Sequence, residues 1–163
     1  MSGDSHASWV ADLVWLDHAN YSSSSGAGSV GVEFAGSAVS SPCPYGQNIS
    51  LNSANNYSSW LVGANSELQW NDLYYRGYFE LQISYDEVNA SFFGMPTIIN
   101  RNPYEISLAN FTVKNGANAL SRPVAGGIVE SGALKIGSVH QTNATNNTAN
   151  GQWFVSMDNE EDI

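Results

Sequence analysis

An aspartate and a histidine two positions apart, Asp4 and His6, are the residues whose types and spacing most directly indicate chemistry. They stand in the segment Gly3-Asp4-Ser5-His6, and an extended or turning backbone there would let both side chains face one pocket. A carboxylate supplies a hard oxygen and a neutral imidazole a borderline nitrogen, a combination suited to iron, zinc or manganese. The segment therefore predicts part of a metal site. The alternative is a chance match at a frayed N-terminus.

Other catalytic schemes have little support. The sequence contains no Gly-x-Ser-x-Gly elbow, no phosphate-binding Gly-x-x-x-x-Gly-Lys-Ser/Thr loop and no dinucleotide fingerprint. Its one cysteine, Cys43, excludes an intrachain disulfide and a cysteine-based zinc cluster. Cys43 lies between two prolines without a basic neighbour to activate its thiol, so a structural role is expected. We expect His18 to cap a helix and His140 to be solvated.

Composition limits the classes of partner. The chain of 163 residues is long enough for one domain with a hydrophobic core. With 5 Lys and Arg against 15 Asp and Glu, its formal charge of −10 argues against a nucleic-acid-binding patch and against binding to anionic membranes. An acidic protein that acts on phosphate esters would need metal cations to reverse the local field. No segment has the length of a membrane span.

Hydrophobic periodicity predicts the elements that must position the motif. Residues 7–16 fit a short helix, because Trp9 and Leu13, like Val10 and Val14, are four positions apart. Residues 30–39 fit a strand with Phe34 facing inward. Residues 50–65 fit a second helix with Ser50 or Ser53 as N-cap and a stripe of Ala54, Tyr57, Leu61 and Ala64.

The second half of the chain shows one clear strand pattern. Residues 77–85 alternate regularly, and the Asp86-Glu87 connection to residues 88–95 predicts an antiparallel hairpin. Residues 68–75 are compact and aromatic and are expected to form an irregular wall, whereas residues 105–113 form a weaker strand. The pattern decays after Asn115. We expect a domain over 1–140 and a polar, flexible tail over 141–163.

Four sequence blocks, in their order, resemble the C-terminal part of the PhoD-like alkaline phosphatases (alkaline phosphatase D), particularly the fungal members. The resemblance extends from Gly3 to about Lys135. The blocks are Gly3-Asp4-Ser5-His6-Ala7-Ser8-Trp9, then Glu33-Phe34 with Val39-Ser40-Ser41-Pro42, then Glu67-Leu68-Gln69-Trp70, and finally Arg76-Gly77-Tyr78.

The resemblance implies a metal-dependent phosphomonoesterase or phosphodiesterase with iron and calcium at its active site. It implies that Asp4 and His6 bind metal, and that His6 has a catalytic role, touching the phosphate or a metal-bound water. It places Glu33 near the pocket, although a solvated Glu33 is an equal alternative. Arg76 could clamp a phosphate, but the structural role it has in the family is preferred. Asp12 is expected either on the surface of the helix over residues 7–16 or in contact with the metal ligands rather than with the metal itself.

The implied fold is α/β, as the C-terminal part of a two-sheet metallophosphatase sandwich flanked by helices; the residues alone indicate a β-rich chain with two short helices. The family's other motifs, including its cysteine and its Asp-x-x-Tyr and Asn ligands, have no counterpart here, and Cys43 lies in the wrong block. We therefore expect a truncated, inactive portion whose partner is the missing N-terminal part of the same domain. The alternative function is a secreted, non-catalytic β-rich binding module.

Seven Asn-x-Ser/Thr sequons predict a secreted or cell-wall glycoprotein, although no signal peptide precedes the motif. Chance also produces sequons in a chain rich in Asn and Ser. The sequons begin at Asn20, Asn48, Asn56, Asn89, Asn110, Asn143 and Asn146.

Overall fold

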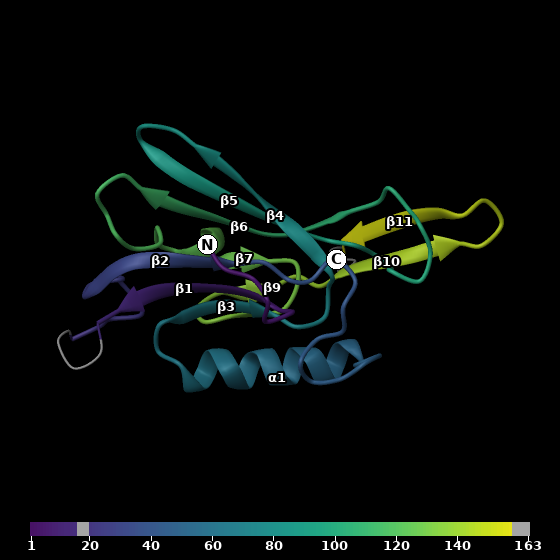
Figure 1. Cartoon of the computed structure of the whole chain (residues 1–163), viewed down its shortest axis with the longest axis horizontal. Helices are drawn as coiled ribbons and strands as arrows, with labels where there is room; N and C mark the ends of the chain where they lie inside the picture. Colours follow the sequence, from purple (N-terminus) through teal and green to yellow (C-terminus); the bar gives the residue numbers. More distant parts are fainter. Residues whose placement is uncertain (16–19, 158–163) are drawn as a thin grey trace, which may run out of the picture.

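The computed structural model describes residues 1–15 and 20–157, and it shows two β-sheets packed face to face with one helix outside them (Figure 1). The first sheet has the order β2-β1-β3-β8 and the second the order β4-β5-β6. The strands of the first sheet are β1 (Ser8–Val14), β2 (Ser29–Ala35), β3 (Leu68–Asp72) and β8 (Ala133–Leu134). Those of the second are β4 (Gly77–Ile83), β5 (Glu87–Gly94) and β6 (Ile106–Lys114).

Helix α1 (Leu51–Ala64) lies on the outer face of the first sheet against β3 and β8 (Figure 1). Ser50 caps it, because its Oγ accepts a hydrogen bond of 3.1 Å from the backbone N–H of Ser53. The predicted helix is thus confirmed, but its buried face is Ala54, Ser58 and Val62. Tyr57, which was expected in the buried stripe, is 44% exposed.

The helix predicted over 7–16 is wrong, because residues 8–14 form strand β1. This strand lies between β2 and β3 and pairs antiparallel with both. Val10 packs into the core between the sheets, whereas Ala11 packs on the side of Val62 in α1. A strand that is buried on both faces lacks the alternation that identifies a strand, so its apolar run was mistaken for a helix.

The irregular wall expected over 68–75 is also wrong, because residues 68–72 form strand β3. All five of its residues are buried. Val10 pairs with Trp70 and Ala11 with Leu68, so Gln69 is the extra residue of a β-bulge. Leu68 and Trp70 are two positions apart and would share one face of a regular strand. The bulge instead lets Leu68 pack near α1 and Trp70 pack between the sheets, so the sequence of β3 lacks the alternation of a strand.

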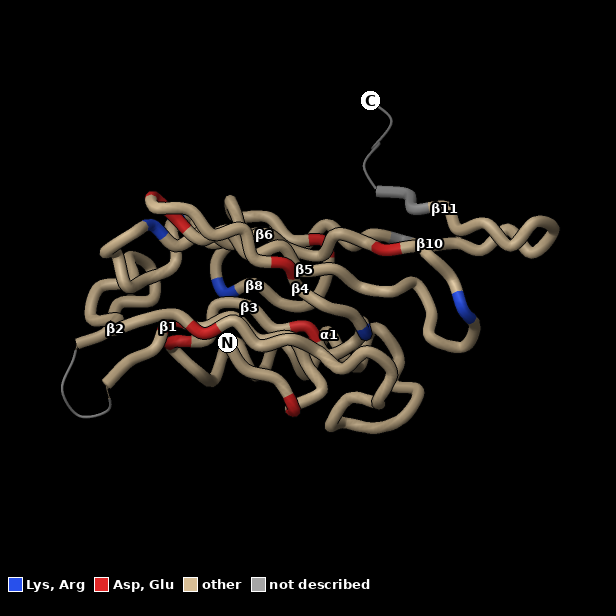
Figure 2. The backbone as a smooth tube through the Cα atoms, turned by 45° about the horizontal axis from the view of Figure 1, so that its top comes forward, with Lys and Arg blue, Asp and Glu red and all other residues tan. Residues whose placement is uncertain are grey.

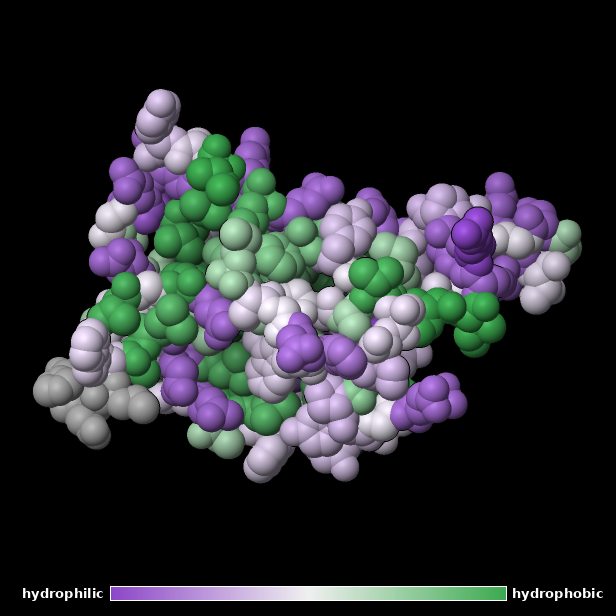
Figure 3. All heavy atoms as spheres, in the orientation of Figure 1, coloured by the Kyte–Doolittle hydropathy of each residue, from purple (hydrophilic) through white to green (hydrophobic). Residues whose placement is uncertain are grey.

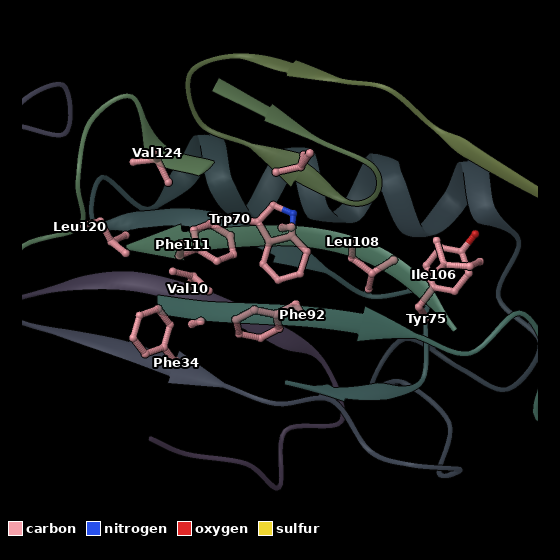
Figure 4. Close-up of a cluster of buried hydrophobic side chains, with 13 residues drawn as sticks. Val10, Phe34, Trp70, Tyr75, Phe92, Ile106, Leu108, Phe111, Leu120 and Val124 are labelled. Carbon is pink, nitrogen blue, oxygen red and sulfur yellow. The ribbon is translucent and has the colours of Figure 1, made fainter. Parts of the chain in front are cut away.

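The hairpin of β4 and β5 is confirmed, with pairs from Gly77 opposite Gly94 to Ile83 opposite Val88. Strand β6 then pairs with β5. Aromatic rings fill the space between the two sheets (Figure 4): the centroid of Phe92 lies 5.1 Å from Trp70 and 5.6 Å from Phe111. Fully buried aromatic side chains from both sheets therefore form the centre of the sandwich.

The two lateral sides of the sandwich differ. A further segment of the chain covers one, the closed side, and the edge strands β2 and β4 lie at the other, which we call the open side. On the closed side, β6 contacts the 3₁₀ turn η1 (Val124–Gly127) and β7 (Ile128–Val129), which pairs with β9 (Ser138–Val139). On the open side, β2 and β4 are the edge strands of their sheets. They lie over each other there, since a Cβ at Gly36 would come within 3.1 Å of the Phe79 ring. Figure 3 shows hydrophobic residues over the hairpin of β4 and β5 and along β2.

A hairpin occupies most of the region expected to be a polar tail. Strands β10 (Thr142–Asn147) and β11 (Gln152–Met157) pair antiparallel and extend away from the sandwich (Figure 1). Thr142 anchors it, because its Oγ1 donates a hydrogen bond of 2.6 Å to the Glu130 carboxylate. The division into a domain and a flexible tail stays a prediction. Among the described residues, no helix is long and apolar enough to cross a membrane.

Candidate metal centre

The Gly3–His6 turn leads into the central strand of the first sheet. Before it, Ser2 forms a parallel bridge to Ala35 at the outer edge of β2, with Ser2 N–H donating to the Phe34 carbonyl at 3.0 Å. After it, β1 begins at Ser8. Asp4 and His6 have φ angles of 70° and 55°, in the left-handed region. Such a backbone costs a non-glycine residue about 1–3 kcal/mol and occurs preferentially at functional sites.

Hydrogen bonds hold this turn. The Ser5 N–H donates to the Gly3 carbonyl at 2.9 Å, and the Trp9 indole N–H donates to Ser5 Oγ at 2.8 Å. His6 Nδ1 lies 3.0 Å from the carbonyl oxygen of Pro42. Because a carbonyl oxygen only accepts, Nδ1 carries a proton, and in the neutral imidazole the lone pair is then on Nε2. A histidine fixed through one ring nitrogen in this way is oriented to bind a metal with the other.

Arg76 connects the turn to two other loops. Its guanidinium donates from Nη1 to the carbonyls of His6 and Ser41 and from Nη2 to that of Leu73, each at 2.9 Å. Burial lowers the pKa of Arg76, and the nearby Cys43 and Asp72 oppose this shift. The sequence left Arg76 either as a phosphate clamp or as a structural residue. Because its guanidinium already donates to three backbone carbonyls, the contacts support the structural role.

Asp72, which the sequence did not single out, positions the loop that carries Arg76. Its Oδ1 accepts hydrogen bonds from the backbone N–H groups of Tyr74 at 3.0 Å and Tyr75 at 2.8 Å. Its Oδ2 accepts from Ser131 Oγ at 2.5 Å. Complete burial raises the pKa of Asp72, against the lowering effect of these hydrogen bonds and of Arg76. An Asp at the end of a strand, followed by a short loop, is the pattern that could have indicated this turn.

The raised pKa of Asp72 predicts a pH dependence of stability. A folded-state pKa above the ordinary 3.8 means that the folded protein binds this proton more tightly than the unfolded chain. The contribution to stability is therefore complete below pH 3.8 and is lost as the pH rises through the folded-state pKa. In Asp72→Asn the side-chain oxygen still accepts hydrogen bonds, and the side-chain NH₂ can donate to Ser131. The free energy of unfolding of this variant should increase relative to that of the native chain as the pH rises.

Urea unfolding of both proteins from pH 3.5 to pH 8 measures this difference. Exposed Asp86, changed to Asn, is the matched control for the loss of one carboxylate. A constant difference between Asp72→Asn and the native chain would contradict the shift.

The structure also places Glu33 and Asp12. Glu33, half-buried on β2, accepts a hydrogen bond of 2.6 Å from Ser2 Oγ, so it supports the residue that precedes the turn. Asp12 is not on a helix surface as expected: it is fully buried on β1. It forms an ion pair of 2.5 Å with Arg122 and accepts hydrogen bonds from Tyr21 and from the Leu120 N–H. Asp12 is therefore a structural residue.

Asp4 and His6 fit a metal as part of a donor set. Asp4 is exposed, and His6 is half-buried, with no hydrogen-bond partner for its Nε2 within the described part of the chain. No group of three or more His, Cys, Asp or Glu side chains within residues 1–15 and 20–157 is arranged to hold a metal ion. His140 is half-buried, rather than solvated as expected, and His18 lies outside the described residues. Two donors of suitable chemistry thus stand at the turn.

A family model described as PhoD-like phosphatase matches residues 1–92. A solved structure, titled "Structure of PhoD", matches with a TM-score of 0.55 and 22% sequence identity. The match covers 84% of this chain and 23% of that chain, so this chain spans less than a quarter of the matched protein. No curated protein matches. The structural likeness confirms the expected fold, a β-rich part of a two-sheet sandwich.

Proposed function

Because the chain belongs to the PhoD-like phosphatase family, whose model matches more than half of its 163 residues, we propose that it forms part of a metal-dependent enzyme that hydrolyses phosphate mono- or diesters. The observation that carries this proposal is the Gly3–His6 turn. Two left-handed residues there present a carboxylate and an imidazole, and the Pro42 carbonyl leaves Nε2 of that imidazole free.

In this proposal Asp4 and His6 bind metal ions, of which iron and calcium are the expected pair. A bound metal ion supplies Lewis-acid polarisation of a phosphoryl oxygen and lowers the pKa of water. His6 acts through Nε2, on the metal or on the phosphate, while the Nδ1 hydrogen bond fixes its ring. Arg76 positions the backbone of His6 through the 2.9 Å hydrogen bond. Acidic residues are spread over the chain with few basic ones (Figure 2), so bound cations would be needed to attract an anionic ester.

The other metal ligands come, in this proposal, from another part of a PhoD-like domain that docks on the open side of the sandwich. Edge strands expose unpaired backbone groups and are the sites where another strand adds. The parallel bridge between Ser2 and Ala35 already marks the orientation of a strand beside β2. Exposed apolar side chains on the same side, Val30 at 54% and Ile83 at 70%, would be covered by that part. The chain by itself is then inactive.

Metal binding by the 163-residue chain tests the assignment of Asp4 and His6. Titration with Mn²⁺, followed by paramagnetic broadening of the backbone amide signals of residues 3–9, should show binding at the turn. Asp4→Asn and His6→Ala should each weaken it by about tenfold or more. The matched controls, Asp86→Asn and His140→Ala, should not change it.

Turnover of 4-nitrophenyl phosphate by the same proteins provides the second measurement. Activity is expected only after the complementary part of the domain is added. Unchanged Mn²⁺ binding in both Asp4→Asn and His6→Ala would refute the metal assignment, and turnover by the chain alone would refute the dependence on another part.

Secretion of the parent protein, in the extracellular space or the cell wall, is supported by the positions of its sequons. Asn48, Asn56 and Asn110 are exposed. Asn89 is half-buried on β5, where its side chain bonds to Glu87 and to Thr112 at 2.9 and 2.6 Å. After expression behind a signal peptide, peptide mass mapping should find glycans at the exposed sequons and none at Asn89. A protein without glycans would contradict secretion through a glycosylating pathway.

A further inference from the structure

A pocket of about 360 Å³ opens beside the Gly3–His6 turn. Three loops form it: residues 40–49 between β2 and α1, residues 73–76 between β3 and β4, and residues 95–99 after β5. Its volume lies in the range of pockets that bind small molecules. Apolar and aromatic side chains line it from all three loops, among them Ile49, Leu73, Tyr74, Tyr75, Met95 and Ile98.

Two contacts connect this pocket directly to His6. Pro42, which lines the pocket, accepts the hydrogen bond from His6 Nδ1. Arg76, which also lines it, donates to the carbonyl of His6. A phosphate ester held at the turn would therefore have this pocket as the neighbouring space for the rest of the molecule.

The chemistry of the lining indicates what the pocket accepts. The chain has a net charge of −10, yet among the residues that the structure describes no Asp or Glu lines the pocket, and Arg76 is the one charged residue there. Arg76 is 5% exposed, and its Nε has no hydrogen-bond partner among the described residues. The lining thus combines aliphatic and aromatic side chains with the uncharged polar residues Ser40, Gln47, Asn48 and Thr97, and the Arg76 guanidinium is largely buried behind it. Such a lining favours an apolar group that carries uncharged polar atoms and disfavours cations.

We propose that this pocket binds the alcohol part of the phosphate ester and selects aromatic or branched apolar alcohols. The proposal rests on the proposed phosphatase function for the identity of the ligand. The ring of a phenol would pack against Tyr74, Met95 and Ile98. Its oxygen, the atom shared with the phosphate in the ester, would face the side of the pocket nearest His6, where Pro42 lies.

Binding of phenol to the 163-residue chain without metal tests the pocket. Methyl signals of Ile98 and Met95 should shift in a saturable titration. Ile98→Asp should raise the Kd for phenol roughly tenfold or more, because it places a charge in an apolar lining. Ile83→Asp is the matched control: Ile83 is also exposed, lies on β4 and does not line the pocket, so the Kd should not change. No saturable shift, or equal effects of the two substitutions, would overturn the proposal.

Ile98→Asp in the complemented, metal-loaded protein separates this inference from the phosphatase assignment. Ile98→Asp should raise the KM for phenyl phosphate with little change in kcat, and it should leave the kinetics with methyl phosphate unchanged. Equal losses for the two esters would overturn the role in selecting the alcohol. Phenol binding without turnover would refute the phosphatase assignment and leave an apolar binding pocket, whereas turnover without phenol binding would do the opposite.

Discussion

Trp70→Ala should lower the free energy of unfolding by about 3–5 kcal/mol. Trp70 is completely buried between the two sheets, with its ring centroid 5.1 Å from that of Phe92 and 5.4 Å from that of Phe111. Its indole N–H also donates to the Ser131 carbonyl at 2.9 Å. The substitution creates a cavity and removes this hydrogen bond, and a typical domain has only about 5–15 kcal/mol of stability.

Denaturant unfolding measures this effect, and the chain supplies its own control. Trp60 lies on α1 and is 63% exposed, so Trp60→Ala should change the stability by no more than about 0.5 kcal/mol. Trp70→Phe, which retains an aromatic ring, should fall between the two. Equal losses for Trp70→Ala and Trp60→Ala would show that the sandwich core is not centred where Figure 4 places it.

The second large effect concerns the buried ion pair of Asp12 and Arg122. Asp12 is 0% exposed and the Arg122 side chain is 16% exposed, with 2.5 Å between Nη2 and Oδ2. Removing one partner leaves the other charge buried and uncompensated, which costs about 3–5 kcal/mol. Burial of Tyr21 and then its hydrogen bond to Asp12 raise the pKa of the Tyr21 hydroxyl.

A double-mutant cycle with Asp12→Asn and Arg122→Met measures the coupling. Each single substitution should destabilise the protein strongly, and the double substitution should cost clearly less than the sum, because it leaves no lone charge. Strictly additive losses would mean that the two side chains do not interact in solution.

The hairpin and the helix could be predicted from the sequence because their patterns are local. Residues 77–83 alternate along an edge strand, and Ser50 provides an N-cap. Strands β1 and β3 could not be predicted, since β1 is buried on both faces and the bulge at Gln69 interrupts the period of β3. Strands β10 and β11 were missed because their Asn- and Thr-rich start carries no apolar alternation.

The spacing of Asp4 and His6 identified the turn but not what surrounds it. The groups that fix His6 and Arg76 are the backbone carbonyls of Pro42, Ser41 and Leu73. A carbonyl belongs to every residue type, so no sequence pattern reports that it lies near another loop. Asp12 was placed on the wrong element, and its partner is 110 positions away.

That separation has a consequence for the order of events during synthesis. Asp12 leaves the ribosome 110 residues before Arg122, an interval of roughly 5–20 s at about 5–20 residues per second. During that interval the carboxylate lacks its Arg122 partner. If strand β1 settled between β2 and β3 in that time, it would bury an unpaired carboxylate. We therefore expect the central sheet to close only after Arg122 has been made, with the nascent N-terminal strands accessible to chaperones until then.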